Sequence, residues 1–113
     1  MNVTTAQHGA VTVITVSESR LTYPVLADFA TVAADAITRG EKRILIDLAS
    51  VGYVDSATIG CLMDLYRQAT ATGGRLKLSG VQKRVETMLT MTGAHHFLEV
   101  YADQPAALAS FGG

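Results

Sequence analysis

Short apolar runs rich in β-branched residues alternate along this chain with longer segments of helical spacing. The clearest run is RILIDL, residues 43–48, which is almost continuously apolar, as expected of a strand covered on both faces. Helical spacing resumes soon after it in a stripe of apolar residues: Ile59, Leu62, Met63, Tyr66 and Ala69. Strands that alternate with helices in this way predict right-handed crossovers and an α/β domain on a mixed sheet.

The N-terminal third of the chain predicts a hairpin and a helix. Two β-branched segments, residues 2–7 and 10–16, surround a glycine turn and indicate an antiparallel pair of strands. Residues 17–22 are expected to form a polar connection. Pro24 suits the first turn of a helix, because the missing N–H has no partner there in any case, and apolar spacing continues to Ile37.

The C-terminal half predicts the remaining elements. Residues 51–54 either continue the central strand or approach the next turn. A short strand is expected at residues 76–78 with Lys77 pointing outward, and a third helix runs from Val81 to Leu89. Two elements complete the chain, a strand over residues 97–100 and a helix over residues 105–111. The predicted order is ββαβαβαβα, with a sheet of four or five strands flanked by helices.

Composition supports one domain over residues 1–113, with a frayed end at Gly112-Gly113. The 113 residues are 49% hydrophobic with a formal net charge of −1, so neither disorder nor a basic nucleic-acid surface is expected. No apolar run approaches the roughly 20 residues of a membrane span, and the start lacks the basic residues of a secretory signal. The single cysteine, Cys61, cannot form an internal disulfide. We therefore expect a cytoplasmic domain without membrane insertion.

The segment from Tyr53 to Gly60 carries the main functional candidate. The central strand leads through a short loop into a helix whose first turn lies near Asp55 and Ser56, and either side chain is a natural N-cap. Composition alone favours an ordinary cap. A serine at a helix N-terminus is also a favourable place for a phosphate, and the loop lies at the carboxyl end of a predicted parallel strand, where α/β sheets bind ligands and partners.

The sequence from Ile44 to about Leu108 resembles the STAS domain of anti-sigma-factor antagonists. The resemblance rests on Asp55-Ser56 at the helix start, the paired Gly73-Gly74, Ser79-Gly80-Val81 and Met91-Thr92-Gly93. It implies a STAS-type α/β fold and makes Ser56 the residue that is phosphorylated.

The resemblance also implies partners. Unphosphorylated, the domain would bind an anti-sigma factor that is a serine kinase, and a serine phosphatase would reset it after phosphorylation. The domain would be a substrate, with no catalytic residues, cofactor or metal of its own. The implied partner-binding residues are Asp55, Ser56, Ala57, Thr58, Ile59, Met63 and Thr22.

Two departures from the family pattern leave an alternative open. Thr58 replaces the usual glycine and offers a second hydroxyl, and Thr22 occupies a position that is often acidic. STAS domains also serve as subunits of lipid-transport complexes and as stressosome scaffolds. In such a role the Ser56 region would be a docking surface without phosphate turnover.

Histidines suggest other chemistry, but their spacing does not support it. His95-His96 and His8 lack the cysteine or carboxylate spacing of a metal site. A hydrolase that used Ser56 with one of these histidines and Asp47 or Asp55 would lack the Gly-x-Ser-x-Gly turn. We expect His95-His96 to lie in a surface turn and Cys61 to be packed within its helix.

Overall fold

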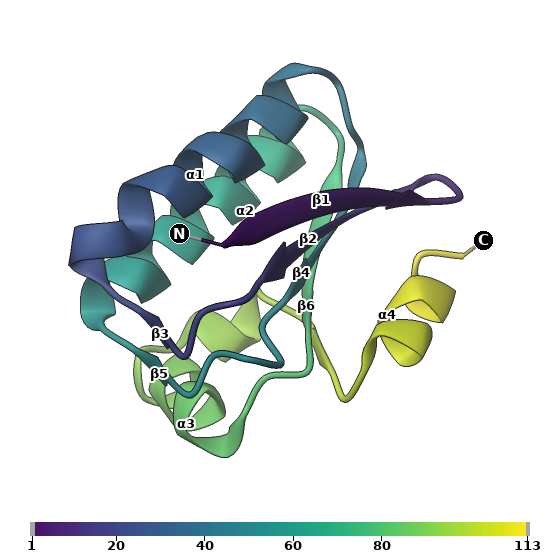
Figure 1. Ribbon diagram of the computed structural model, residues 1–113. Helices are drawn as coiled ribbons and strands as arrows, with labels where there is room; N and C mark the ends of the chain where they lie inside the picture. Colours follow the sequence, from purple (N-terminus) through teal and green to yellow (C-terminus); the bar gives the residue numbers. More distant parts are fainter. Residues whose placement is uncertain (1, 113) are drawn as a thin grey trace.

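A five-stranded mixed sheet runs through the middle of the molecule (Figure 1), whose computed structural model describes residues 2–112. The strands lie in the order β1 (Val3–His8), β2 (Val11–Val16), β4 (Arg43–Asp47), β6 (Arg75–Ser79) and β7 (Val100–Tyr101). β1 pairs with β2 in antiparallel fashion, and the other neighbours are parallel. The predicted N-terminal hairpin and mixed α/β sheet are therefore confirmed.

A second, two-stranded sheet lies beside the first and was not predicted. β3 (Arg20–Leu21) pairs in parallel with β5 (Tyr53–Val54). The segment expected to be only a polar connection, residues 17–22, contains β3, and β5 does not extend the central strand. Two-residue strands are too short to show a period of two in the sequence, so only tertiary pairing reveals them.

Three helices cover one face of the large sheet. α1 (Tyr23–Thr38) packs beside α2 (Ser56–Ala71), and α3 (Lys83–Met91) completes the layer next to α2 and β5 (Figure 1). Pro24 lies in the first turn of α1, as predicted. These helices and the sheet share one buried apolar core, whose largest side chains include Phe29, Ile14, Ile46, Leu62 and Leu78. No helix among residues 2–112 is long and apolar enough to cross a bilayer.

The opposite face of the sheet is covered by the C-terminal helix alone. α4 (Gln104–Ser110) and the following Phe111 pack on Val11, Val13 and Leu45 in a second, smaller core. In Figure 1 this helix lies apart from the other three. The prediction of a terminal helix is confirmed; the expected frayed end includes Gly113, which lies outside the described residues.

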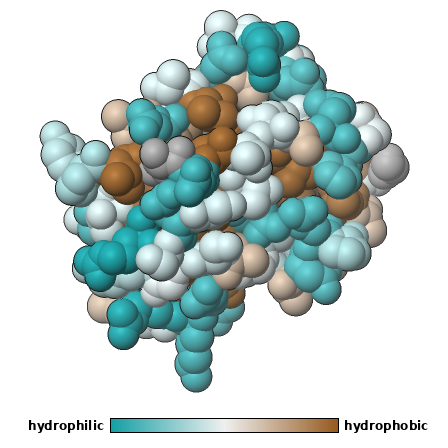
Figure 2. Space-filling view, viewed as in Figure 1, coloured by the Kyte–Doolittle hydropathy of each residue, from teal (hydrophilic) through white to brown (hydrophobic). Residues whose placement is uncertain are grey.

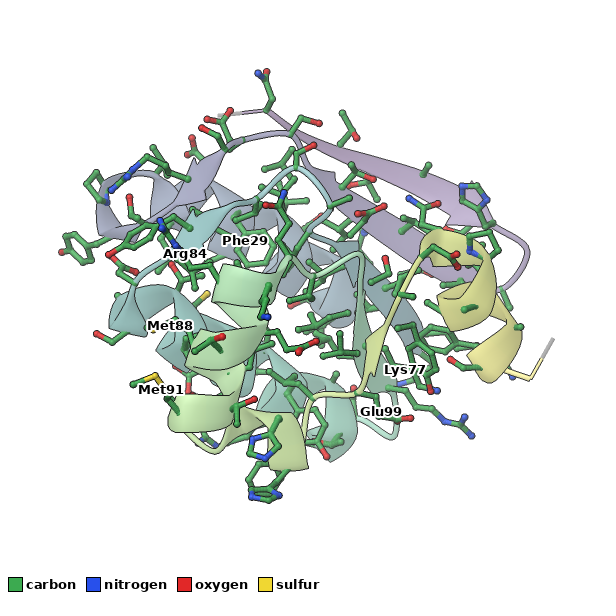
Figure 3. The ribbon with its side chains drawn as sticks, turned by 90° about the horizontal axis from the view of Figure 1, so that it is seen from below. Phe29, Lys77, Arg84, Met88, Met91 and Glu99 are labelled. Carbon is green, nitrogen blue, oxygen red and sulfur yellow. The ribbon has the colours of Figure 1, made fainter. Side chains whose placement is uncertain are left out.

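Lys77 points into this second core, so the prediction that it faces outward is wrong. Only 4% of Lys77 is exposed. Its Nζ donates to the backbone oxygen of Ser110 at 3.1 Å and to Ser110 Oγ at 3.0 Å, and it lies 4.7 Å from the centroid of the Phe111 ring. Figure 3 shows Lys77 close to Glu99, whose Oε2 is 3.8 Å from Nζ. The ammonium group of Lys77 is therefore buried but has hydrogen-bond and charge partners, and the sequence alone did not indicate this burial.

The segment after α3 also differs from the prediction. Residues 94–96 form a short 3-10 helix, η1 (Ala94–His96), and the last strand begins only at Val100. Gly93 adopts a positive φ of 78° where α3 ends, and the backbone N–H of Leu98 then donates to Ala94. The apolar residues Phe97 and Leu98 thus belong to a turn, in which Leu98 is buried in the core and Phe97 is 53% exposed.

Candidate functional site

The candidate site is the N-terminus of α2. β5 ends at Val54, Asp55 has the extended backbone of an N-cap, and Ser56 is the first helical residue. Asp55 Oδ1 accepts a hydrogen bond from the backbone N–H of Thr58 at 3.0 Å. The structure therefore assigns the cap to Asp55, and the Ser56 hydroxyl is not needed for it.

Asp55 also joins the starts of two helices. Its Oδ2 accepts a hydrogen bond from the backbone N–H of Tyr23, the first residue of α1, at 2.9 Å. This bond, followed by those from the N–H and hydroxyl of Thr58, holds the pKa of the Asp55 carboxyl below its ordinary value, although burial acts in the opposite direction. Asp55 is thus a carboxylate at neutral pH and fixes Ser56 relative to α1.

Thr58 has a structural role beneath the site. Its side chain is completely buried, and Oγ1 donates to the backbone oxygen of Leu21 at 2.6 Å and lies 2.9 Å from Asp55 Oδ1. The suggestion that Thr58 offers a second accessible hydroxyl is therefore wrong. The residue therefore connects α2 to β3.

The other residues expected to bind a partner differ in exposure. Ser56 is exposed, whereas Asp55, Ala57, Met63 and Thr22 are half-buried. Ile59 is only 4% exposed, so its side chain packs in the core together with Thr58 and is not available for contact. The surface expected to bind a partner thus retains these accessible residues: Asp55, Ser56, Ala57, Met63 and Thr22.

The position of Ser56 can accommodate an anion. The first N–H groups of a helix have no intrahelical acceptors and carry the positive end of the helix dipole. Asp55 uses its side chain on the N–H of Thr58, so the N–H groups of Ser56 and Ala57 stay free of acceptors in the described part of the chain. A phosphate on Ser56 would lie beside these groups while the capping hydrogen bonds stay in place.

Two arginine side chains lie near the ring of Tyr53, a residue of the small sheet two positions before Asp55. The guanidinium carbon of Arg20 lies 4.5 Å from the centroid of the Tyr53 ring, and that of Arg84 lies 6.0 Å from it. Arg84 lies on the same face of α3 as Met88 and Met91 (Figure 3). The grouping of Arg20, Tyr53 and Arg84 was missed from the sequence, because these residues come from β3, β5 and α3, which are far apart in the chain.

An open apolar pocket lies on the other flank, between α1 and α2. It has a volume of about 410 Å³ and is lined by Tyr23, Pro24, Leu26, Ala27, Ala30 and Cys61. Burial, with a smaller effect of Asp64, raises the pKa of the half-buried Cys61 thiol. Figure 2 shows apolar surface among polar residues over α1. The pocket was not predicted, because neither helix alone reveals which small side chains leave space between them.

The histidines do not join the site. His95 and His96 are exposed in η1 with their ring centroids 4.0 Å apart, while His8 lies in β1. Residues 2–112 contain no group of three or more histidine, cysteine, aspartate or glutamate side chains placed to hold a metal ion. None of the hydrogen bonds of His95 or His96 in this part of the chain reaches Ser56, so the arrangement gives no support to a hydrolase.

Comparison with known proteins identifies the fold family. A family model described as "Mlab, STAS domain" matches residues 3–100, which is most of the chain. This chain belongs to the STAS-domain family. The predicted resemblance is confirmed, and it extends through the N-terminal hairpin, where the sequence alone gave the weaker agreement.

Individual relatives agree with this assignment. The STAS domain is 26% identical over 65 residues to a Thermotoga neapolitana protein named as a candidate anti-sigma factor antagonist, and this match covers 58% of each chain. A STAS domain protein from Planctomyces limnophilus has a similar fold, with a TM-score of 0.90 at 22% identity over 98% of both chains. The Bacillus cell-fate determinant SpoIIAA, solved in its phosphorylated form, gives a TM-score of 0.75 at 16% identity, covering 97% of this chain and 99% of that chain.

Proposed function

We propose that this STAS domain is an anti-sigma factor antagonist whose recognition of a serine-kinase anti-sigma factor is controlled by phosphorylation of Ser56. The observation that carries the proposal is the position of Ser56, which is exposed on the first turn of α2 directly after the capping aspartate. The similarity to proteins named as anti-sigma factor antagonists supports the choice of partner.

Transfer of a phosphoryl group needs little from this domain. The kinase would bind ATP and remove the proton of Ser56 Oγ as the oxygen attacks the γ-phosphorus, and ADP would leave. A serine phosphatase would return the hydroxyl by hydrolysis, with inorganic phosphate as the product. The domain acts by binding, and its contribution is to present the hydroxyl on a rigid helix end, because Asp55 and Thr58 fix that end to α1 and β3.

Phosphorylation would change recognition more than it changes the fold. It adds a charge of about −1.5 to −2 at a helix N-terminus, where a negative charge is stabilised. The same charge opposes binding to the kinase, because the phosphate would have to lose its hydration water when the interface forms. The unmodified form would therefore hold the anti-sigma factor and release its sigma factor, and the phosphorylated form would let the anti-sigma factor go. The phosphorylated structure of SpoIIAA supports the proposal by likeness of fold.

A second candidate is a binding subunit that does not switch. The description of the matching family names MlaB, and a lipid-transport or stressosome-like assembly would use the same α2 N-terminus for permanent docking. In that case Ser56 would be a contact residue without phosphate turnover.

The deciding experiment mixes the purified protein with a serine-kinase anti-sigma factor and ATP and locates phosphate by mass spectrometry. We expect one phosphate on the peptide that contains Ser56 and none in Ser56→Ala. A stable complex that forms without phosphorylation of the wild type would favour the permanent subunit. A kinase that is active on another antagonist but neither binds nor modifies this protein would overturn the proposal.

A further inference from the structure

We propose that the pocket between α1 and α2 receives an apolar side chain of the kinase that engages Ser56, and anchors that interface. The inference rests on the proposed function, because it names where the partner binds. The occupant is an aromatic or branched aliphatic residue of a protein partner.

The pocket begins next to the switch residue. Its rim residue Tyr23 donates its backbone N–H to Asp55 at 2.9 Å, and Asp55 directly precedes Ser56. On the other wall, Cys61 follows Ser56 by five positions in α2, which corresponds to a rise of about 7.5 Å along the helix. Five positions also correspond to about 140° around the helix, so Ser56 and the pocket share the N-terminal end of α2 but lie on different sides of it.

An interface of ordinary area that is centred on Ser56 would extend over the pocket. A specific protein interface buries about 800 Å² on each partner, which is a disc of roughly 16 Å radius. A kinase that buries such an area around Ser56 therefore covers Tyr23 and the pocket beside it. An apolar cavity inside a contact area is where a buried anchor residue contributes most to affinity.

The lining fits an uncharged side chain. Ala27 and Ala30 leave space because they are small, while Pro24 and Leu26 supply apolar walls. Burial raises the pKa of Cys61, so its thiol is neutral at physiological pH and adds to the apolar lining. The aromatic ring of Tyr23 stands at the rim with 73% of the residue exposed, although tyrosine is typical of the residues that bury at interfaces.

The position also couples the pocket to phosphorylation. A phosphate on Ser56 holds a shell of water at the same end of α2, and a kinase that covers this end to reach the pocket must remove that water. Phosphorylation of Ser56 would therefore prevent the apolar anchor from binding in the pocket, in addition to placing an unfavourable charge at the interface.

The first test fills the pocket. Ala30→Leu places a branched side chain in the space, and Ala71→Leu, at the exposed far end of α2, is the matched control. We expect the dissociation constant of the kinase, measured by calorimetry without ATP, to rise at least tenfold in Ala30→Leu and to change less than twofold in Ala71→Leu. Circular dichroism and thermal unfolding of both variants check that they fold.

The second test uses the wild type and does not depend on a variant. Cys61 is the only cysteine of the chain, so the rate at which iodoacetamide modifies its peptide reports on the pocket alone. We expect saturating kinase to slow this modification at least tenfold. Equal rates with and without bound kinase would overturn the inference, and so would an unchanged affinity of Ala30→Leu.

The outcomes separate the two proposals. A kinase that binds and phosphorylates Ser56 while Cys61 stays fully reactive leaves the switch in place and removes the pocket as its anchor. A wild-type protein that binds no serine-kinase anti-sigma factor removes both. Protection of Cys61 by a kinase that never phosphorylates Ser56 supports the anchor and contradicts the switch.

Discussion

Three neighbouring side chains have different roles at the start of α2. Asp55 caps the helix and binds the N–H of Tyr23, Thr58 connects the helix to β3 from below, and Ser56 is left exposed. The capping and connecting hydrogen bonds are made without the serine, which keeps its hydroxyl available for other chemistry. A change at Ser56 therefore alters the surface, whereas a change at Thr58 alters the fold.

This division predicts which hydroxyl a kinase can modify. In Ser56→Ala, we expect no phosphate on Thr58, because its side chain is fully buried and its oxygen contacts Leu21 and Asp55. Thr58→Val should keep phosphorylation of Ser56 but lower the free energy of unfolding by about 1–2 kcal/mol through the lost buried hydrogen bond. Phosphopeptide mapping and urea unfolding measure both. Phosphate on Thr58 in Ser56→Ala would contradict the assignment.

The lowered pKa of Asp55 predicts that the free energy of unfolding depends on pH. Its pKa is lowered in the fold from an ordinary value of 3.8, so it stabilises the protein above that pH and loses this contribution as the pH falls through its lower folded value. Asp55→Asn turns the acceptor toward Tyr23 into a donor and should cost about 1 kcal/mol at pH 7. The difference from the wild type should shrink below pH 3.8 in urea unfolding at several pH values. A difference that grows in acid would show the opposite sign of shift.

At the scale of elements, the small sheet of β3 and β5 positions the site. It brings Arg20 and Tyr53 together, and Thr58 fastens the same strand to α2. The N–H of Gly52 donates to Ser19 at 2.8 Å and closes the connection between the two strands. These contacts fix the loop before Ser56, although only two residues of each strand pair.

The sequence predicted elements whose periodicity is long and missed those that depend on partners. The run at residues 43–48 and the stripes of α1 and α2 were sufficient for the fold, and Asp55-Ser56 correctly marked the start of α2, where the candidate site lies. Lys77 was wrongly predicted to face outward, because the hydrogen-bond acceptors of its ammonium group belong to Ser110, 33 positions later in the chain. The pocket and the arginines around Tyr53 were missed for the same reason, since each is assembled from separate elements.

The contact of α4 with the sheet predicts a large loss of stability from one residue. Phe111 is 2% exposed against Val11, Val13 and Leu45, and Phe111→Ala should lower the free energy of unfolding by about 3–5 kcal/mol. Loosening of α4 should also uncover the apolar face, so binding of the dye ANS should rise. Ala109→Ser, on the exposed side of α4, is the control. An unchanged urea midpoint in Phe111→Ala would show that α4 does not hold this face.

At the scale of the molecule, the two faces of the sheet have separate tasks. The face under α1, α2 and α3 carries the site at one end of the helices, whereas the face under α4 is closed by a smaller core around Phe111 and Lys77 (Figure 1). Ser56 lies on the surface of the first layer and is not part of the second core. Recognition can therefore change while the packing of the whole domain stays as it is.

This separation predicts how Ser56→Glu behaves. A carboxylate at the first helical position suits the helix dipole, so thermal unfolding should shift by no more than a few degrees, in keeping with a change of about 0.3–1 kcal/mol. Binding to the kinase should weaken by about 1–3 kcal/mol, because the charge must lose water at the interface. Ser56→Gln has nearly the same shape without the charge, and calorimetry of the two variants isolates the electrostatic part. Equal affinities of the glutamate and glutamine variants would mean that size, rather than charge, controls recognition at this helix end.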